Sequence, residues 1–256
     1  MGKLDDFCKI PQTLCKYRAW NDFTKQILIK HQLYFSNPDD FNDPYDCKPI
    51  VEEVEFRFTP DAKVFLQKAD GTFIESPINN GSINIGYTLQ KQIAQQSWSS
   101  FRICSFTEIA DNILMWSHYA DYHKGLCLVF DTTKDTECFS RGCGIIYSNK
   151  RPKYGLGQEI KLINPLTTKF IDWAYEQEFR IIKFPTEHQN NQSNLFGFNP
   201  AALTEIIFGA KAPLKLFYEV RKLCQENGLE HVSFSKMHIA DEELYKLLKA
   251  PIEINK

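Results

Sequence analysis

Two carboxylates and a cation alternate in the segment W-A-Y-E-Q-E-F-R, which spans residues 173–180. If this segment enters a strand, the two-residue period places Glu176, Glu178 and Arg180 on one face. Neighbouring charges shift each other's pKa, so one of the carboxylates could act on a developing positive charge. The alternative interpretation is a solvated strand face on which Arg180 neutralises Glu178.

Two shorter segments carry further polar side chains that could serve a site. Tyr17 and Arg18 end a predicted strand, where the arginine can bind a phosphate through two parallel hydrogen bonds and the tyrosine can stack on a flat ring. Ser105 and Thr107 would place their hydroxyls on one face of another strand. Each segment also has a structural interpretation, as a packed strand end.

Two further motifs contain candidates for lining a pocket. In N-I-L-M-W-S-H-Y-A, Met115, Trp116 and Tyr119 share one helical side, a spacing that more often indicates core packing than a ligand site. The turn F-N-D-P-Y-D is either structural or presents Asn42, Asp43 and Asp46 beside a pocket.

The elements that must position these residues mix strands and helices. We expect strands at residues 14–18, 33–36, 101–106, 125–130, 144–147, 176–184, 203–209 and 232–236. We expect helices at residues 21–31, 88–96, 113–119, 165–173, 212–228 and 241–248. Strands outnumber crossover helices between residues 101 and 184, which favours an α+β fold with mixed, mainly antiparallel sheets and flanking helices.

The composition indicates one globular domain over residues 1–256, with hydrophobic residues at 43% and charged residues at 24%. Residues 60–98 are expected to form an insertion or excursion within it, because the stretch 70–86 is rich in Gly, Pro and Asn. The formal net charge of -2 argues against binding nucleic acid or anionic membranes through whole-molecule charge. Any nucleic-acid substrate must therefore be held locally.

The sequence also predicts where the chain works and which groups it lacks. No apolar run approaches the roughly 20 residues that span a bilayer, and Asp5 and Asp6 lie where a signal peptide has its apolar centre, so we expect a cytoplasmic protein without a membrane partner. The eight cysteines form no C-x-x-C pair and are expected to be reduced, mostly buried thiols. His118 and His123 are five residues apart, a poor spacing for two metal ligands on one helix, so we assign no metal.

Several of these segments together resemble the bacterial domain-of-unknown-function family 2971. The resemblance spans residues 14–209 and rests on L-x-K-Y-R, L-Y-F-S with F-N-D-P-Y-D, C-S-F-T-E, N-I-L-M-W-S-H-Y-A, G-L-C-L-V-F-D, W-A-Y-E-Q-E-F-R and E-I-I-F-G. It implies a toxin-like or phage-defence protein, for which a neutralising partner or antitoxin would be a natural partner.

A more remote resemblance is to the ADP-ribosyltransferase fold. Arginine-type members carry an Arg at the end of the first strand, then a Ser-x-Ser/Thr strand, then a Glu-x-Glu strand. Arg18, Ser105-Phe106-Thr107 and Glu176-Gln177-Glu178 follow that order, although a large insertion must then lie between the first two motifs.

This second resemblance implies NAD as a substrate and a protein or nucleic acid as the acceptor of ADP-ribose. Glu178 would be the catalytic carboxylate beside the ribose, braced by Ser105 and Thr107, and Glu176 would orient or deprotonate the acceptor. Arg18 would hold the NAD pyrophosphate or ribose.

The remaining candidates would complete the same pocket. Tyr17 or Trp116 would stack on a ring of NAD, and the expected pocket-lining residues are Asn42, Asp43, Tyr119 and Arg180.

Two other function classes stay open at this stage. A metal-dependent nuclease or phosphodiesterase could use His118, Asp121 and His123 with the acids of F-N-D-P-Y-D. A non-catalytic module could use an aromatic pocket to sense a nucleotide or a phage protein.

Overall fold

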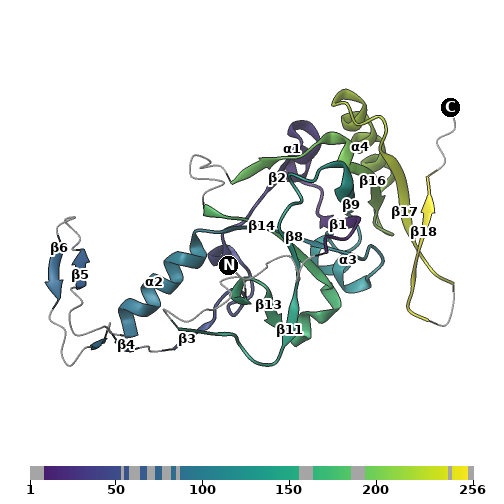
Figure 1. Cartoon of the computed structure of the whole chain (residues 1–256). Helices are drawn as coiled ribbons and strands as arrows, with labels where there is room; N and C mark the ends of the chain where they lie inside the picture. Colours follow the sequence, from purple (N-terminus) through teal and green to yellow (C-terminus); the bar gives the residue numbers. More distant parts are fainter. Residues whose placement is uncertain are drawn as a thin grey trace.

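The computed structural model describes residues 9–52, 55–57, 64–67, 73–76, 82–84, 87–155, 164–185, 194–241 and 244–252. Its centre is an eight-stranded sheet (Figure 1). Across the sheet the strands follow the order β10 (Gly142–Gly144), β14 (Glu178–Lys183), β8 (Arg102–Thr107), β1 (Thr13–Arg18), β9 (Leu126–Asp131), β16 (Leu203–Phe208), β17 (Ser233–Ile239) and β18 (Leu247–Pro251). Only β16 and β17 pair in parallel within this sheet. The expected α+β class with a mainly antiparallel sheet is confirmed.

Five two-stranded ribbons and four α-helices surround the sheet in the described part of the chain. The ribbons pair β2 (Gln32–Tyr34) with β15 (Leu195–Gly197), β3 (Ile50–Glu52) with β12 (Lys153–Gly155), β11 (Ile146–Ser148) with β13 (Thr168–Phe170), β4 (Glu55–Arg57) with β7 (Ser82–Asn84), and β5 (Val64–Gln67) with β6 (Phe73–Ser76). The helices are α1 (Asp22–Lys30), α2 (Tyr87–Ser99), α3 (Ile113–Tyr119) and α4 (Leu214–Glu226). Short 3-10 turns include η2 (Pro38–Asp40), η3 (Thr132–Lys134), η4 (Asn164–Leu166), η5 (Ile171–Glu176) and η7 (Pro200–Ala202).

The two faces of the sheet are covered by different helices because successive strand residues point to opposite sides. Leu14 of β1 packs in a core with residues of α1 and α4, which lie side by side (Figure 1). Cys15 and Tyr17 face the other way and pack with Trp116 of α3. The sheet is therefore a central layer between α1 and α4 on one face and α3 on the other.

Helix α1 begins where the sequence places its cap. The side chain of Asn21 accepts a hydrogen bond from the Thr24 backbone N–H at 3.0 Å, which satisfies a donor that the helix cannot pair internally. His31 ends the helix in the left-handed conformation with a φ of 51°. The cap at Asn21 places the start of α1 shortly after the end of β1 at Arg18.

The excursion predicted for residues 60–98 is described only in part. Residues 58–63, 68–72, 77–81 and 85–86 lie outside the described part of the chain, so most of that prediction is not tested. Figure 1 draws β5 and β6 at the far left, beyond α2. The end of α2 belongs to the body of the protein instead, because Ala94 and Trp98 are buried in a core with Tyr154 and Ile182.

Two predicted helices are wrong. Residues 165–173 form the end of η4, the strand β13 and the start of η5, and β13 obtains its backbone partners from parallel pairing with β11. The second predicted helix covered residues 241–248, but Leu247 begins β18, which pairs antiparallel with β17 and extends the main sheet. In both places pairing with another strand decides the local structure against helix propensity.

The described cysteines follow the expectation of buried thiols. Seven of them are free and buried, namely Cys15, Cys47, Cys104, Cys127, Cys138, Cys143 and Cys224. Within the described ranges, no helix is both long and apolar enough to cross a membrane.

Candidate active site

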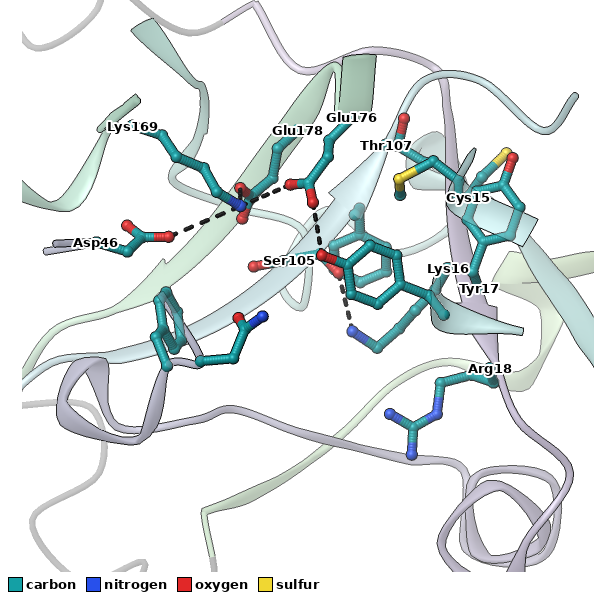
Figure 2. Close-up of a pocket in the computed structure, with 15 residues that line it drawn as sticks. Cys15, Lys16, Tyr17, Arg18, Asp46, Ser105, Thr107, Lys169, Glu176 and Glu178 are labelled. Carbon is teal, nitrogen blue, oxygen red and sulfur yellow. Dashed lines mark hydrogen bonds and ion pairs between the residues drawn. The ribbon is translucent and has the colours of Figure 1, made fainter. Parts of the chain in front are cut away.

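A cavity of about 200 Å³ lies where β1 and β8 separate. Within these two strands, backbone pairing joins only Cys15 to Thr107, whereas β1 pairs with β9 along its whole length and β8 pairs fully with β14. The sheet is therefore split beyond this point. Figure 2 shows the side chains that enter the opening from both strands and from neighbouring segments. The lining residues are Cys15, Lys16, Tyr17, Arg18, Phe41, Asn42, Asp46, Ser105, Phe106, Thr107, Met115, Tyr119, Lys169, Glu176 and Glu178.

A cluster of five buried charges, which we call the charge cluster, comprises Asp46, Lys169, Glu176, Glu178 and Arg180. The first four form one wall of the cavity, and Arg180 lies behind Glu178. The Lys169 ammonium donates to Glu176 at 2.6 Å and to Glu178 at 3.0 Å, and it lies 3.8 Å from Asp46. The Arg180 guanidinium donates to Glu178 at 2.7 Å and to Asp46 at 2.6 Å. Three carboxylates thus surround two cations, which leaves one formal negative charge within the cluster.

The ion pairs keep Glu178 charged in spite of its burial. Burial alone would raise the pKa of this carboxyl, but the charges of Arg180 and Lys169 overcome that effect and lower its pKa to about 2. A hydrogen bond from the Ser105 side chain acts in the same direction. Burial opposes the charged form of Lys169 as well, and Glu178 and Glu176 raise the pKa of its ammonium. At neutral pH both partners are ionised.

The two glutamates reach the cavity from different elements. Glu176 ends the turn η5, Gln177 adopts the left-handed conformation with a φ of 43°, and Glu178 begins β14. The expectation that Glu176 shares a strand face with Glu178 is therefore wrong. The reversal at Gln177 nevertheless directs both carboxylates to Lys169. From Glu178 onward the predicted alternation holds, since Phe179 faces the main core and Arg180 lies with Glu178.

Helix α3 holds Glu176 from the other side. The Tyr119 hydroxyl donates to the Glu176 carboxylate at 2.6 Å. Burial, and then this contact with Glu176, raises the pKa of Tyr119. Asn112 caps the helix by accepting from the Met115 N–H at 3.1 Å, and its amide donates to the Tyr175 carbonyl at 2.9 Å. Asn112 thus ties the start of α3 to η5, which fixes Tyr119 relative to Glu176.

The opposite wall is formed by two cations of β1 (Figure 2). The Lys16 ammonium donates to the Ser105 carbonyl at 2.8 Å and lies 5.1 Å from the Phe106 ring centroid. The Arg18 guanidinium donates from Nε to the Thr24 hydroxyl at 3.3 Å, and burial lowers its pKa. Within the described part of the chain, neither cation has an acidic partner at ion-pair distance. Arg18 is therefore a partly desolvated cation whose outer nitrogens are available to an anion.

Close backbone packing holds Arg18 in place. A Cβ atom on Gly125 would lie 2.3 Å from the Arg18 carbonyl oxygen, so only glycine permits this approach at the start of β9. The Thr24 hydroxyl, which accepts from Arg18, itself donates to the Ala19 carbonyl at 2.7 Å. The position of Arg18 is thus set by β9 and by the first turn of α1.

Most of the residues predicted for the site do line the cavity. Those that the structure brings together are Tyr17, Arg18, Asn42, Ser105, Thr107, Tyr119, Glu176 and Glu178. The F-N-D-P-Y-D loop contributes Phe41 and Asp46 as well as Asn42, so it faces the same cavity as Glu178.

Three predicted site residues lie elsewhere. Trp116 is fully buried and its indole N–H donates to the Ala110 carbonyl at 2.8 Å, so it is a core residue and not a surface for stacking on a ligand. Arg180 lies behind Glu178 and is also fully buried. Asp43 does not line the cavity; its carboxylate accepts from the Tyr45 N–H at 2.8 Å, which is the structural alternative for this turn.

Two charged residues of the site, Lys16 and Lys169, were not predicted. Lys16 belongs to a motif already singled out, and a search for cations beside Arg18 could have found it. Asp46 was among the residues that the F-N-D-P-Y-D turn could present beside a pocket, and it does line the cavity. Lys169 has no local signal, because the sequence around it was interpreted as a helix. Its position between the carboxylates depends on β13 pairing with β11.

The histidines considered for a metal site lie outside this cavity. Nε2 of His123 lies 3.0 Å from the Ser117 hydroxyl, and its ring stacks on Trp116 with centroids 6.5 Å apart. His118 packs near Tyr175. Among the described residues, no group of three or more His, Cys, Asp or Glu side chains is placed to hold a metal ion.

Residues 115–181 match the model of a family described as "Protein of unknown function (DUF2971)". The matched segment contains Tyr119, Lys169, Glu176, Glu178 and Arg180, so the family resemblance is confirmed over the part of the chain that builds most of the charge cluster. No curated protein and no solved structure matches the chain. The family description names no activity.

Proposed function

We propose that the cavity between β1 and β8 binds NAD and that the protein transfers ADP-ribose from NAD to a macromolecule. The observation that carries this proposal is the opposition of two walls. One wall holds a buried excess of negative charge beside Glu178, and the other presents Lys16 and Arg18, for which the described residues supply no acidic partner.

The size of the cavity suggests which part of NAD it would enclose. Pockets that bury a whole drug-sized ligand measure about 300–1,000 Å³. At about 200 Å³ this cavity suits the nicotinamide and its ribose. The pyrophosphate would then extend toward β1, where Arg18 can bind phosphate oxygens through parallel N–H groups and Lys16 can add a second charge.

The negative wall suits the cleavage of the bond between nicotinamide and ribose. As this bond breaks, its electron pair moves to the nicotinamide nitrogen and positive charge develops on the ribose, as in glycoside cleavage. Glu178 is ionised, and the charge cluster retains one formal negative charge, so the cluster favours the transition state over the ground state. The acceptor then forms a bond to the ribose carbon and loses a proton, which Glu176 can take and pass to water.

The other cluster residues would position these two glutamates. Arg180 and Lys169 fix the two oxygens of Glu178, and Ser105 adds a hydrogen bond to it. Tyr119 and Lys169 fix Glu176. Transfer to a macromolecule is the activity that the order of the motifs implies, and it would suit a toxin-like or phage-defence effector.

The test is to incubate the purified protein with labelled NAD, with and without cell extract, and to measure released nicotinamide and labelled macromolecules. Glu178→Gln should lower nicotinamide release by at least roughly a hundredfold. The matched control is Glu205→Gln, since Glu205 also accepts from a serine and a lysine, at 2.6 Å from Ser235 and 2.8 Å from Lys249, but lies away from the cavity.

Three outcomes bear on the proposal. Nicotinamide release by the wild type and by Glu205→Gln, together with its loss in folded Glu178→Gln, would support it. Equal release by Glu178→Gln would refute the role of that carboxylate. NAD binding without any release would instead identify a nucleotide-sensing module.

A further inference from the structure

A second pocket, of about 250 Å³, adjoins the charge cluster at β13. Thr168, Lys169 and Phe170 line it, and the Lys169 ammonium also contacts the carboxylates of the first cavity, on the opposite side of β13 from its two neighbours. This arrangement follows from the alternation of side chains along a strand. Residues 148–152 and Tyr45 complete the lining. We call this the β13 pocket.

The side chains of the β13 pocket combine aromatic rings with cations. Tyr45 is 62% exposed and Phe170 is 45% exposed, which is unusual for large rings that share one pocket. Lys150 and Arg151 line the same pocket, and the described lining includes no acidic residue. The Arg151 guanidinium lies 5.2 Å from the Tyr45 ring centroid and donates to the Lys48 carbonyl at 2.6 Å, so this ring and this cation are held together.

We propose that the β13 pocket binds single-stranded nucleic acid and that this nucleic acid is the acceptor of the proposed transfer; the acceptor role rests on the proposed function. Exposed rings stack on bases of any sequence, and neighbouring cations follow the phosphates. The formal net charge of the chain is -2, so nucleic acid can be held only at a local site of this kind. An acidic peptide could use the cations but would leave the two rings without a planar partner.

The position of the β13 pocket fits an acceptor site. The F-N-D-P-Y-D loop forms a wall of both openings, because Phe41, Asn42 and Asp46 line the first cavity and Tyr45 lines the β13 pocket. Lys169 belongs to both linings. A nucleic acid whose base stacks on Tyr45 would therefore lie directly beside the cavity that contains Glu176, the residue proposed to deprotonate the acceptor.

Binding is measured without NAD, by fluorescence anisotropy of labelled oligouridine and oligothymidine of about 12 nucleotides. Oligoglutamate of the same length is the competitor that represents an acidic peptide. The full-length wild type should bind at least one of the two oligonucleotides, and comparison of the two distinguishes RNA from DNA. Glu205→Gln should bind equally well, because that residue lines neither the β13 pocket nor the first cavity.

Substitutions separate stacking from charge. Phe170→Leu and Tyr45→Leu should each weaken binding roughly tenfold, as expected for the loss of one base–aromatic stack. The control Phe23→Leu, on α1 and 79% exposed, should not change it. Lys150→Gln should lower the slope of log K against log salt by about 0.7, the value for one phosphate contact on a single strand. The control Lys134→Gln, an exposed lysine in η3, should leave that slope unchanged.

The proposal is overturned if the folded wild type binds neither oligonucleotide at low salt, or if oligoglutamate binds as well and the ring substitutions have no effect. These results are distinguishable from failure of the proposed function. Oligonucleotide binding without nicotinamide release would support the nucleic-acid site and refute the proposed transferase activity. Nicotinamide release with label only on protein, and no oligonucleotide binding, would support the transferase and overturn this inference.

Discussion

The two walls of the cavity differ in whether their ionised side chains have partners of opposite charge. In the charge cluster every ionised group has a partner of opposite charge within the fold, such as Arg180 with Glu178 and Asp46. On β1, Lys16 and Arg18 bind only neutral oxygens, namely the Ser105 carbonyl and the Thr24 hydroxyl. The charges of the cluster are therefore paired even without a ligand, whereas the cations of β1 gain an opposite charge only when a ligand binds.

The comparison changes the interpretation of Glu178. From the sequence alone, Glu178→Gln would be expected to leave folding intact. The structure shows both oxygens of Glu178 bound to buried cations, so the same substitution must also affect stability. Loss of activity in this variant is informative only when its folded fraction is measured at the same time.

The largest expected effect is on stability, from Arg180→Met. This substitution leaves Glu178 and Asp46 buried without their cation, and removal of one partner of a buried ion pair costs about 3–5 kcal/mol. Urea denaturation should report a loss of that size. The control Lys249→Met removes the half-exposed partner of Glu205 and should cost less than about 1 kcal/mol. If Arg180→Met and Lys249→Met lowered the unfolding free energy equally, the buried ion pairs of the charge cluster would matter no more for stability than an exposed ion pair.

The next effect concerns pH and Glu178. The folded-state pKa of this carboxyl is about 2, below its ordinary value of 4.5, so the unfolded chain takes up the proton first as the pH falls. The stabilisation is therefore complete above about pH 4.5 and is lost between there and pH 2. The difference in unfolding free energy between wild type and Glu178→Gln should shrink by about 3 kcal/mol over that interval. A difference that does not change with pH would show that Glu178 is not held ionised by Arg180 and Lys169.

The sequence predicts the β1 wall, with Arg18, better than the wall formed by the charge cluster, because the first depends on local signals and the second on contacts between distant segments. The elements around Arg18 follow from local signals, since Asn21 caps α1 and a strand ends before it. The charge cluster depends on contacts between distant segments, because Asp46 reaches Arg180 across the chain and Lys169 is placed by the pairing of β13 with β11. No local period encodes such contacts, which is why residues 165–173 were predicted to be a helix and Lys169 was missed.

A smaller effect, on binding, is expected for Arg18→Lys. Lysine keeps the charge but loses the planar fork, so NAD binding measured by calorimetry should weaken by about 1–3 kcal/mol. The unfolding free energy should change by less than about 1 kcal/mol, because the hydrogen bond to Thr24 at 3.3 Å is long. Arg102→Lys is the matched control, since Arg102 donates to Asn194 and to the Ser99 carbonyl. The Arg102→Lys control should lose stability and keep its affinity for NAD. If Arg18→Lys instead lost stability and kept its affinity for NAD, Arg18 would be a structural residue.

The smallest effect is expected for Tyr119→Phe, which removes only the hydroxyl that donates to Glu176. Glu176 keeps its ion pair with Lys169 at 2.6 Å and lines the cavity, where water can replace the lost donor, so the unfolding free energy should fall by about 1 kcal/mol. If Glu176 deprotonates the acceptor, its altered position should reduce the transfer of ADP-ribose to the macromolecule more than the hydrolysis of NAD, in which water takes the place of the acceptor. The ratio of transfer to hydrolysis, measured in the same reaction, should therefore fall severalfold. A loss confined to stability, with that ratio unchanged, would place Glu176 with Arg180 as a residue that only maintains the charge cluster.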